Sequence, residues 1–162
     1  GVDIKGARIW KGAKASHEGK ILNAAFLRTR IELISSFFAP DEVDEIWITF
    51  PDPQPSERRR KKRLTGTSFL TQYQGFLINR GIIHLKTDSD LLYQYTLDLV
   101  NYNNLELIFS TTDLYKSDIV DDILGIKTYY EQKFLEKGSN INYLKFRLTK
   151  EANLHENTEK NG

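Results

Sequence analysis

The sequence contains no cysteine and no methionine, and only three histidines among its 162 residues. The absence of cysteine excludes disulfide bonds, thiol catalysis and cysteine-based zinc sites. His17, His84 and His155 lie far apart, without the short spacing typical of metal ligands, so we predict no metal site. Because no methionine is present even at the start, and GVDIKG resembles a strand end entering a loop, we expect the chain to be the C-terminal part of a longer open reading frame.

Long apolar runs and a strong overall charge are also lacking. No stretch of about 18 apolar residues occurs and no signal peptide is visible, so we expect a cytoplasmic protein without membrane association. The formal net charge is only +1, so any affinity for nucleic acid must come from a local cluster of charges. The length suits one domain, which we place at residues 1–149, followed by a flexible tail at 150–162.

Alternation of strand-like and helix-like apolar patterns predicts an α/β fold. Strands are expected at residues 1–4, 45–50, 82–86, 105–110 and 141–148, and helices at 8–19, 31–38, 68–79, 89–100 and 128–137. Gly81 is expected to end the third of these helices, and the alternating last strand is expected to be half-exposed or at an edge. Strands separated by helices predict a mostly parallel sheet with helices on both faces.

Four apolar runs each end in an aspartate, namely Asp3, Asp52, Asp88 and Asp113. The binding crevice of an open parallel sheet lies beyond the carboxyl ends of its strands. We therefore expect these aspartates to line one edge of one sheet. For any single one, a turn or helix-cap role is the alternative.

Asp52 stands between Pro51 and Pro53, and both prolines restrict the backbone around it. A carboxylate held in this way can orient a donor-rich ligand or a cation with little loss of entropy on binding. The alternative is an Asx-type turn after a strand.

An unbroken basic run follows this aspartate, comprising Arg58, Arg59, Arg60, Lys61, Lys62 and Arg63. Like-charged neighbours repel, so the run is expected to be exposed, and a phosphate backbone would relieve the repulsion. Such contacts would set the register of a nucleic acid without selecting its sequence. A solvated surface run or a localisation-type patch is the alternative.

Two further groups suggest contacts with a nucleotide. An acid at the end of a strand in a nucleotide-binding fold, such as Asp3, typically accepts hydrogen bonds from ribose hydroxyls. Tyr129, Tyr130 and Glu131 at the start of an expected helix offer aromatic rings for stacking and a carboxylate for a base edge. Packing of the helix on the sheet is the alternative for this cluster.

Several segments together resemble a known family. The chain contains EIWITFPDPQP (45–55), RRRKKRLT (58–65), HLKTDSDLLYQYT (84–96), KTYYEQKFLEKG (127–138) and INYLKFRL (141–148). In this order they closely resemble the bacterial tRNA (guanine-N7)-methyltransferases, over about residues 1–148. The resemblance implies a Rossmann-like class I methyltransferase fold whose first βα unit would precede Gly1. It also implies S-adenosylmethionine as cofactor and N7 of guanine 46, in the variable loop of tRNA, as methyl acceptor.

The resemblance implies roles for single residues as well. Asp3 matches the family's acid near the cofactor ribose, and Arg28 or Thr29 stands at a family Asp or Asn near the adenine, where contact would be through the backbone. Asp52 matches the active-site aspartate beside the cofactor. The positions matching substrate contacts are Ser56, Asp88, Thr128, Tyr129, Tyr130 and Glu131. The basic run at 58–63 would contact tRNA phosphates.

Gln54 and Ser56 depart from the family pattern, in which a tryptophan and a substrate-binding lysine occupy these positions. Arg58 or Arg59 would then compensate for the missing lysine. The resemblance admits either a monomer or a homodimer.

The expected chemistry agrees with the residues present. Guanine N7 already carries an acceptor lone pair, so its attack on a methyl group needs no histidine base, cysteine or metal. It needs alignment and control of charge, for which Asp52 and Asp88 are the candidates. The alternatives are a tRNA-binding module without catalysis and a related methyltransferase acting on another guanine.

Overall fold

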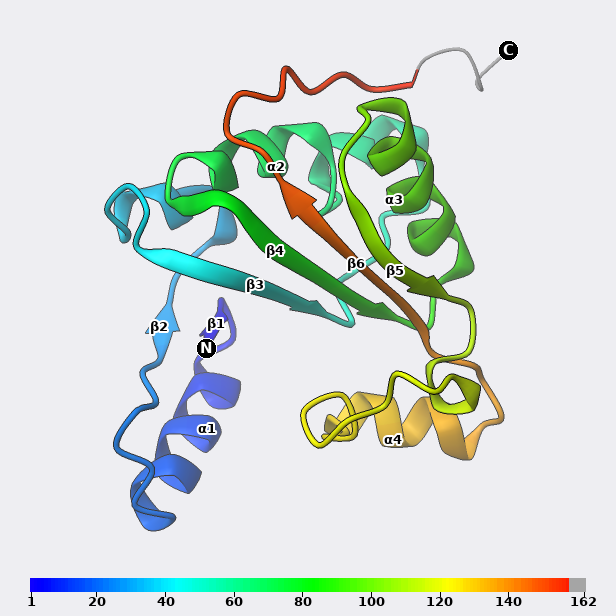
Figure 1. The fold of residues 1–162 in the computed structure, drawn as a ribbon. Coiled ribbons are helices and arrows are strands. Elements are labelled where there is room, and N and C mark those ends of the chain that lie inside the picture. The colour runs from blue at the N-terminus through cyan, green and yellow to red at the C-terminus, as the bar shows by residue number, and fades with distance from the viewer. Residues whose placement is uncertain (158–162) are drawn as a thin grey trace. The chain divides into compact units, whose positions relative to one another are not determined.

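The structure is a computed structural model that describes residues 1–157, and the chain divides into two compact units (Figure 1). Unit one comprises Gly1–Ala39 and unit two begins at Pro40. The sequence had suggested one domain up to residue 149. Each unit is described by itself below.

Unit one is a small βαβ arrangement. Strand β1 (Val2–Asp3) pairs in parallel with β2 (Leu27–Arg28), and helix α1 (Gly6–Glu18) connects them. The 3-10 helix η1 (Ile31–Ser36) follows. The first expected strand and the first expected helix are confirmed, whereas the apolar spacing at 31–38 forms a 3-10 helix.

Unit two is built on a four-stranded sheet in the order β3-β4-β6-β5. Its strands are β3 (Val43–Thr49), β4 (Leu77–Thr87), β5 (Leu107–Thr111) and β6 (Asn142–Leu148). β3 and β4 are parallel, while β6 is antiparallel to both β4 and β5. Three strands therefore run in one direction, and only β6 runs against them.

The prediction that the last strand is half-exposed or at an edge is wrong. β6 lies between β4 and β5, and only Lys145 and Arg147 of its residues are partly exposed. These long side chains can bury their methylene groups and keep their charges in water. The alternation in the sequence therefore reflects two partly exposed basic side chains on one face of an interior strand.

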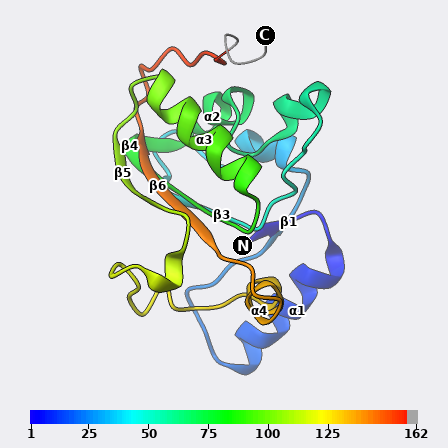
Figure 2. The same cartoon turned by 90° about the vertical axis from the view of Figure 1, so that its right-hand side faces the viewer.

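The core of unit two lies between this sheet and the helices α2 (Thr67–Gln74) and α3 (Asp90–Tyr102), which cover the same face (Figure 2). Strand register places Ile83 opposite Phe146 and Leu85 opposite Leu144, and all four are fully buried. Burial of each such side chain contributes roughly 1.5–3 kcal/mol. α3 begins as predicted, because the Ser89 hydroxyl accepts a hydrogen bond from the Leu92 amide.

Gly81 does not end a helix. α2 ends at Gln74, and Gly81 lies within β4, where the pairing shifts from Val43–Leu77 to Glu45–Ile82. A Cβ at Gly81 would lie 2.5 Å from Leu77 Cγ, so the irregular strand leaves room only for glycine. Packing within β4 therefore requires Gly81, which the sequence analysis had interpreted as the end of a helix.

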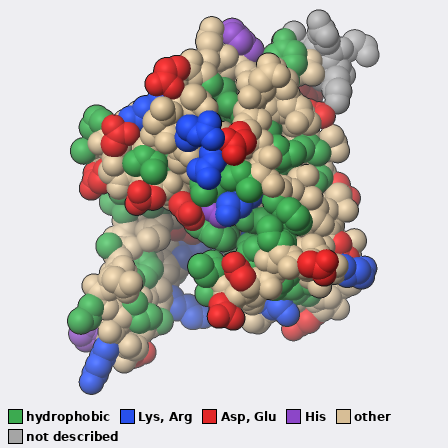
Figure 3. Space-filling model, in the orientation of Figure 1, with side chains coloured by type: hydrophobic (Ala, Val, Ile, Leu, Met, Phe, Trp, Pro, Cys, Tyr) green, Lys and Arg blue, Asp and Glu red, His purple; other side chains and the backbone are tan. Residues whose placement is uncertain are grey.

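The other face of the sheet carries a mixture of apolar, basic and acidic side chains (Figure 3). Trp47 stacks on the buried His84 ring with centroids 3.8 Å apart. His84 Nδ1 lies 2.8 Å from the Tyr143 hydroxyl, and its Nε2 lies 3.2 Å from Glu45 Oε2. Burial, opposed by Glu45, lowers the pKa of His84 to about 4.

Unit two also contains the 3-10 helix η3 (Leu114–Lys116) and the helix α4 (Tyr129–Glu136). α4 begins with a capping box. Thr128 Oγ1 accepts from the Glu131 amide at 3.2 Å, and Glu131 Oε2 accepts from the Thr128 amide at 3.1 Å. Gly138 follows the helix with φ of 77°, a left-handed conformation that favours glycine after a helix end.

Side chains of α2 and α3 form hydrogen bonds with part of the segment that was predicted to be a flexible tail. The Gln74 side chain donates to the carbonyls of Thr149 and Ala152, and the Asn103 side chain bonds both the amide and the carbonyl of His155. The remaining tail residues, 158–162, lie outside the described residues.

Candidate active site and nucleic-acid interface

The carboxyl ends of three strands of unit two meet at one edge of its sheet. Thr49 pairs with Lys86, and the Phe50 amide donates to the Lys86 carbonyl at 2.8 Å. Asp52 and Asp88, which follow β3 and β4, are therefore at this edge, and both side chains are exposed. Asp113 follows β5 at the same edge, because β5 runs in the direction of β4. Asp3 instead ends β1, in the separate sheet of unit one.

The loop that carries Asp52 has a strained backbone. Phe50 has φ of 50° and Gln54 has φ of 47°, a left-handed conformation that costs roughly 1–3 kcal/mol for a residue other than glycine. Asp52 Oδ1 accepts a hydrogen bond from the Gln54 amide at 3.0 Å. The Asx-type turn predicted as the alternative therefore exists, but it uses one oxygen only. Oδ2 makes no hydrogen bond to the described residues.

The start of α4 lies close to this loop. The ring of Phe50 stacks against Phe134 of α4, with centroids 5.7 Å apart. Tyr129 and Tyr130 are exposed and pack edge to face at 5.6 Å. The structure thus brings the Thr128–Glu131 segment to the edge that carries Asp52 and Asp88.

Glu131 itself faces inward and is fully buried. Its Oε1 lies 2.6 Å from Lys86 Nζ and accepts a hydrogen bond of 2.6 Å from the Tyr115 hydroxyl. Burial and this carboxylate raise the pKa of Tyr115. In this conformation Glu131 attaches α4 to β4 and does not face a substrate, which differs from the predicted contact with guanine.

The basic run forms a 3-10 helix, η2 (Glu57–Lys62), instead of an irregular loop. A 3-10 helix has three residues per turn, so residues three apart lie on the same side. Glu57 and Arg60 have this spacing within η2, and Arg63 directly follows η2 in an extended conformation. The two arginines turn toward the protein, where they pair with carboxylates. The remaining basic side chains are exposed, and we call them the outward set: Arg58, Arg59, Lys61 and Lys62. Ser56, directly before η2, is exposed as well.

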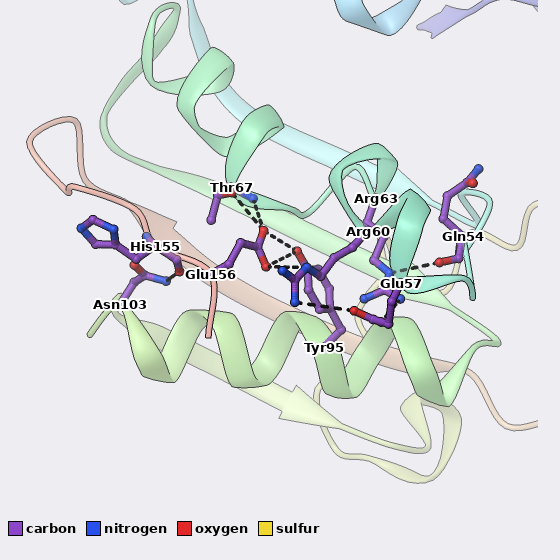
Figure 4. A network of polar contacts seen from close by, with 9 residues as sticks. All are labelled: Gln54, Glu57, Arg60, Arg63, Thr67, Tyr95, Asn103, His155 and Glu156. Carbon is purple, nitrogen blue, oxygen red and sulfur yellow. Dashed lines mark hydrogen bonds and ion pairs between the residues drawn. The ribbon is translucent and has the colours of Figure 1, made fainter. Parts of the chain in front are cut away.

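Arg63 is buried, with 2% of its surface exposed, so the prediction that it contacts a tRNA phosphate differs from the structure. Its Nη2 donates to Glu57 Oε1 at 2.9 Å, and its Nε donates to the Gln54 carbonyl at 3.2 Å (Figure 4). The guanidinium lies 4.4 Å from the centre of the Tyr95 ring. The carboxylate of Glu57 thereby offsets part of the repulsion between the like charges of the run.

Arg60 pairs with two carboxylates, those of Glu57 and Glu156, at 3.5 Å each. Glu156 also accepts hydrogen bonds of 2.9 Å from the hydroxyls of Tyr95 and Thr67. Burial, together with Glu156, raises the pKa of Tyr95. Glu57, Arg60, Arg63, Tyr95 and Glu156 are among the residues that line a cavity of about 310 Å³. The roles of Tyr95 and Glu156 were missed because α3 and the C-terminal segment are far apart in sequence.

Unit one contains the other predicted contacts. Asp3 Oδ1 accepts from the Lys5 amide at 2.8 Å, and Oδ2 pairs with Arg8 at 3.2 Å. Arg28 is paired with Asp3 in the strand register, and its side chain donates to the Ile4 carbonyl. The Thr29 hydroxyl lies 3.4 Å from the Arg30 carbonyl.

No helix among residues 1–157 is long and apolar enough to span a membrane. Within the same residues, no group of three or more His, Cys, Asp or Glu side chains is arranged to hold a metal ion.

Solved structures with a similar fold are methyltransferases. They include the geranyl diphosphate C-methyltransferase of Streptomyces coelicolor A3(2), with a TM-score of 0.52 and 14% identity over 92% of this chain and 63% of that one. A methyltransferase homologue of Pyrococcus horikoshii has a TM-score of 0.56 and 15% identity over 90% of this chain and 52% of that one. The chain therefore has the Rossmann-like methyltransferase fold, as predicted.

Sequence comparisons define the family more narrowly. A family model described as "Putative methyltransferase" matches residues 1–144. The tRNA (guanine-N(7)-)-methyltransferase of Bacteroides fragilis is 55% identical over 155 residues, covering 96% of this chain and 61% of the relative. The enzyme of the same name in Mycoplasmopsis pulmonis is 41% identical over 80% of this chain and 68% of its own length. The chain belongs to the tRNA (guanine-N7)-methyltransferase family, and it spans about 61% of the length of the Bacteroides fragilis relative.

Proposed function

We propose that the protein transfers a methyl group from S-adenosylmethionine to N7 of guanine in tRNA, at position 46 of the variable loop. One observation carries the proposal. Asp52, Asp88 and the start of α4 share the carboxyl edge of one sheet, next to a helix with an exposed basic side, in a chain 55% identical to an enzyme of that name.

Unit one supplies groups that suit the nucleoside part of the methyl donor. Asp3 follows a parallel strand, and each of its oxygens retains acceptor capacity beyond the bonds to Lys5 and Arg8, as ribose hydroxyls require. Arg28 and Thr29 would contact the adenine through their backbone. S-adenosylmethionine supplies the electrophilic methyl group.

Unit two supplies the groups that hold the base. Asp52 Oδ2 and Asp88 are exposed acceptors at one edge, suited to the N–H groups of guanine. Tyr129 and Tyr130 offer exposed rings for stacking, and Thr128 and Ser56 offer hydroxyls. Glu131, buried against Lys86, holds this segment in position. Because N7 needs no deprotonation, these residues act by alignment and by electrostatics.

The outward set of η2 supplies the contacts to phosphate. Arg58, Arg59, Lys61 and Lys62 are exposed side by side, at a site next to the Asp52 loop in sequence. They would attract the tRNA backbone and fix its register without selecting its sequence.

The test is methyl transfer to unmodified tRNA from labelled S-adenosylmethionine, with the modified guanine mapped, for the native protein and Asp52→Ala. We expect N7-methylguanosine at position 46 with the native protein and no detectable transfer with Asp52→Ala. Asp44→Ala, at the exposed opposite end of β3, is the matched control and should retain activity. Binding of tRNA without any methylation by the native protein would contradict the proposal, as would near-normal turnover of Asp52→Ala.

A further inference from the structure

The conformation of the Asp52 loop requires support from outside the loop. Phe50 and Gln54 both have positive φ values, and neither is a glycine. Pro51 and Pro53 restrict their own φ angles, but neither of them fixes the φ angle of Gln54. Something that contacts Gln54 must therefore offset the strain of its backbone conformation.

Arg63 makes this contact. Its Nε donates to the Gln54 carbonyl at 3.2 Å, while the Gln54 amide donates to Asp52 Oδ1 at 3.0 Å. A single residue, Gln54, thus connects the Arg63 guanidinium to the Asp52 carboxylate through its own backbone. Any displacement of Arg63 would move the amide that orients Asp52.

Arg63 is in turn fixed on its other sides. Glu57 accepts from its Nη2, and Tyr95 of α3 lies against the face of its guanidinium. The Tyr95 hydroxyl is bonded to Glu156, so the C-terminal segment holds the ring in place (Figure 4). The planar guanidinium suits this position because it donates in two directions and stacks at the same time.

We propose that Arg63 is a positioning residue that sets the conformation of the Asp52 loop, and that it is not a phosphate contact. Its role in turnover rests on the function proposed above, whereas its effect on the loop does not. The same basic run therefore contains two different functions, that of the exposed side chains of η2 and that of the buried Arg63 that directly follows it.

Arg63→Lys tests the proposal, because lysine keeps the charge but cannot donate to Gln54 and Glu57 in a fork while stacking on Tyr95. We expect kcat to fall about tenfold or more, with KM for tRNA unchanged, since misplacement of a reacting group by about 1 Å can cost on the order of 100-fold. Arg80→Lys, whose side chain is exposed at the far end of β4, is the matched control and should behave as the native protein.

Amide hydrogen exchange provides a second measurement that does not depend on activity. The Gln54 amide should exchange faster in Arg63→Lys than in the native protein, because its bond to Asp52 would form less of the time. The Arg80→Lys variant should leave this rate unchanged. If Arg63→Lys does not fold, Glu57→Gln replaces it, with smaller changes expected in the same directions.

Three results would overturn the proposal. These are normal kcat in a folded variant of an active enzyme, unchanged exchange at Gln54, and a higher KM for tRNA at unchanged kcat. The last would make Arg63 a phosphate contact. If the native protein transfers no methyl group, the proposed function fails, and the exchange rate at Gln54 alone decides whether Arg63 holds the loop.

Discussion

The basic run at 58–63 carries the same kinds of side chain in opposite situations. Arg58, Arg59, Lys61 and Lys62 point to solvent, whereas Arg60 and Arg63 are paired with carboxylates and Arg63 is 2% exposed. A run of like charges is therefore not one structural unit. The carboxylates of Glu57 and Glu156, available on the inner side, determine which residues of the run become structural.

The largest effect on stability is expected at the deeply buried charge pair of Lys86 and Glu131. Lys86→Met removes the cation and leaves the Glu131 carboxylate buried with fewer partners. This should lower the free energy of unfolding by about 3–5 kcal/mol. Urea denaturation measures it, and a loss below about 1 kcal/mol would show that burial of this pair has little bearing on stability.

Arg63→Ala should have the second-largest effect on stability. It removes a buried side chain and leaves Gln54 and Tyr95 without their partner, but Glu57 remains largely in water. We expect a loss of about 2–3 kcal/mol in the free energy of unfolding. The same denaturation experiment checks this value, and a loss equal to that of an outward residue would remove the distinction between the two sides.

His84 differs from the inward arginines because it is buried without charge. Burial lowers its pKa from 6.5 to about 4, so the unfolded state binds the extra proton between these pH values. The contribution of neutral His84 to stability is complete above pH 6.5 and is lost as the pH falls toward 4. His84→Gln should show a flatter decrease in this range by thermal unfolding, and a profile parallel to the native one would contradict the assignment.

The smallest effect on stability is expected for Arg59→Gln, in the outward set. Because Arg59 is exposed and η2 does not depend on it, the free energy of unfolding should change by less than about 0.5 kcal/mol. Thermal denaturation beside Arg63→Ala measures the contrast. A loss comparable to that of Arg63→Ala would mean that the outward residues also hold the structure.

Local patterns predicted most elements of this fold. The starts of α3 and α4 were predicted at Ser89 and Thr128, and the residues that cap each helix lie within three positions of one another. The pattern of β6 suggested an edge strand, because the sequence does not show that an antiparallel strand is inserted between two others. Gly81 suggested a helix end for a similar reason, since its requirement comes from the Leu77 side chain in an irregular strand.

The candidate site follows the same rule. Asp52 and Asp88 could be predicted because strand direction alone brings their ends to one edge. The inward orientation of Arg63 and Glu131 could not, because it depends on Tyr95, Glu156, Lys86 and Tyr115, each more than ten residues away from the residue it contacts. The predicted exposure of the basic run is therefore correct for Arg58, Arg59, Lys61 and Lys62 and wrong for Arg63.

The salt dependence of tRNA binding tests the division of η2 most directly. The slope of log K against log salt concentration should decrease by about 0.7–0.9 for Arg59→Gln, because one phosphate contact is lost. For Arg63→Gln the slope should equal that of the native protein, although both variants lose one positive charge. An equal decrease in both slopes would show that Arg63 also contacts phosphate and would contradict the separation of the basic run into two functions.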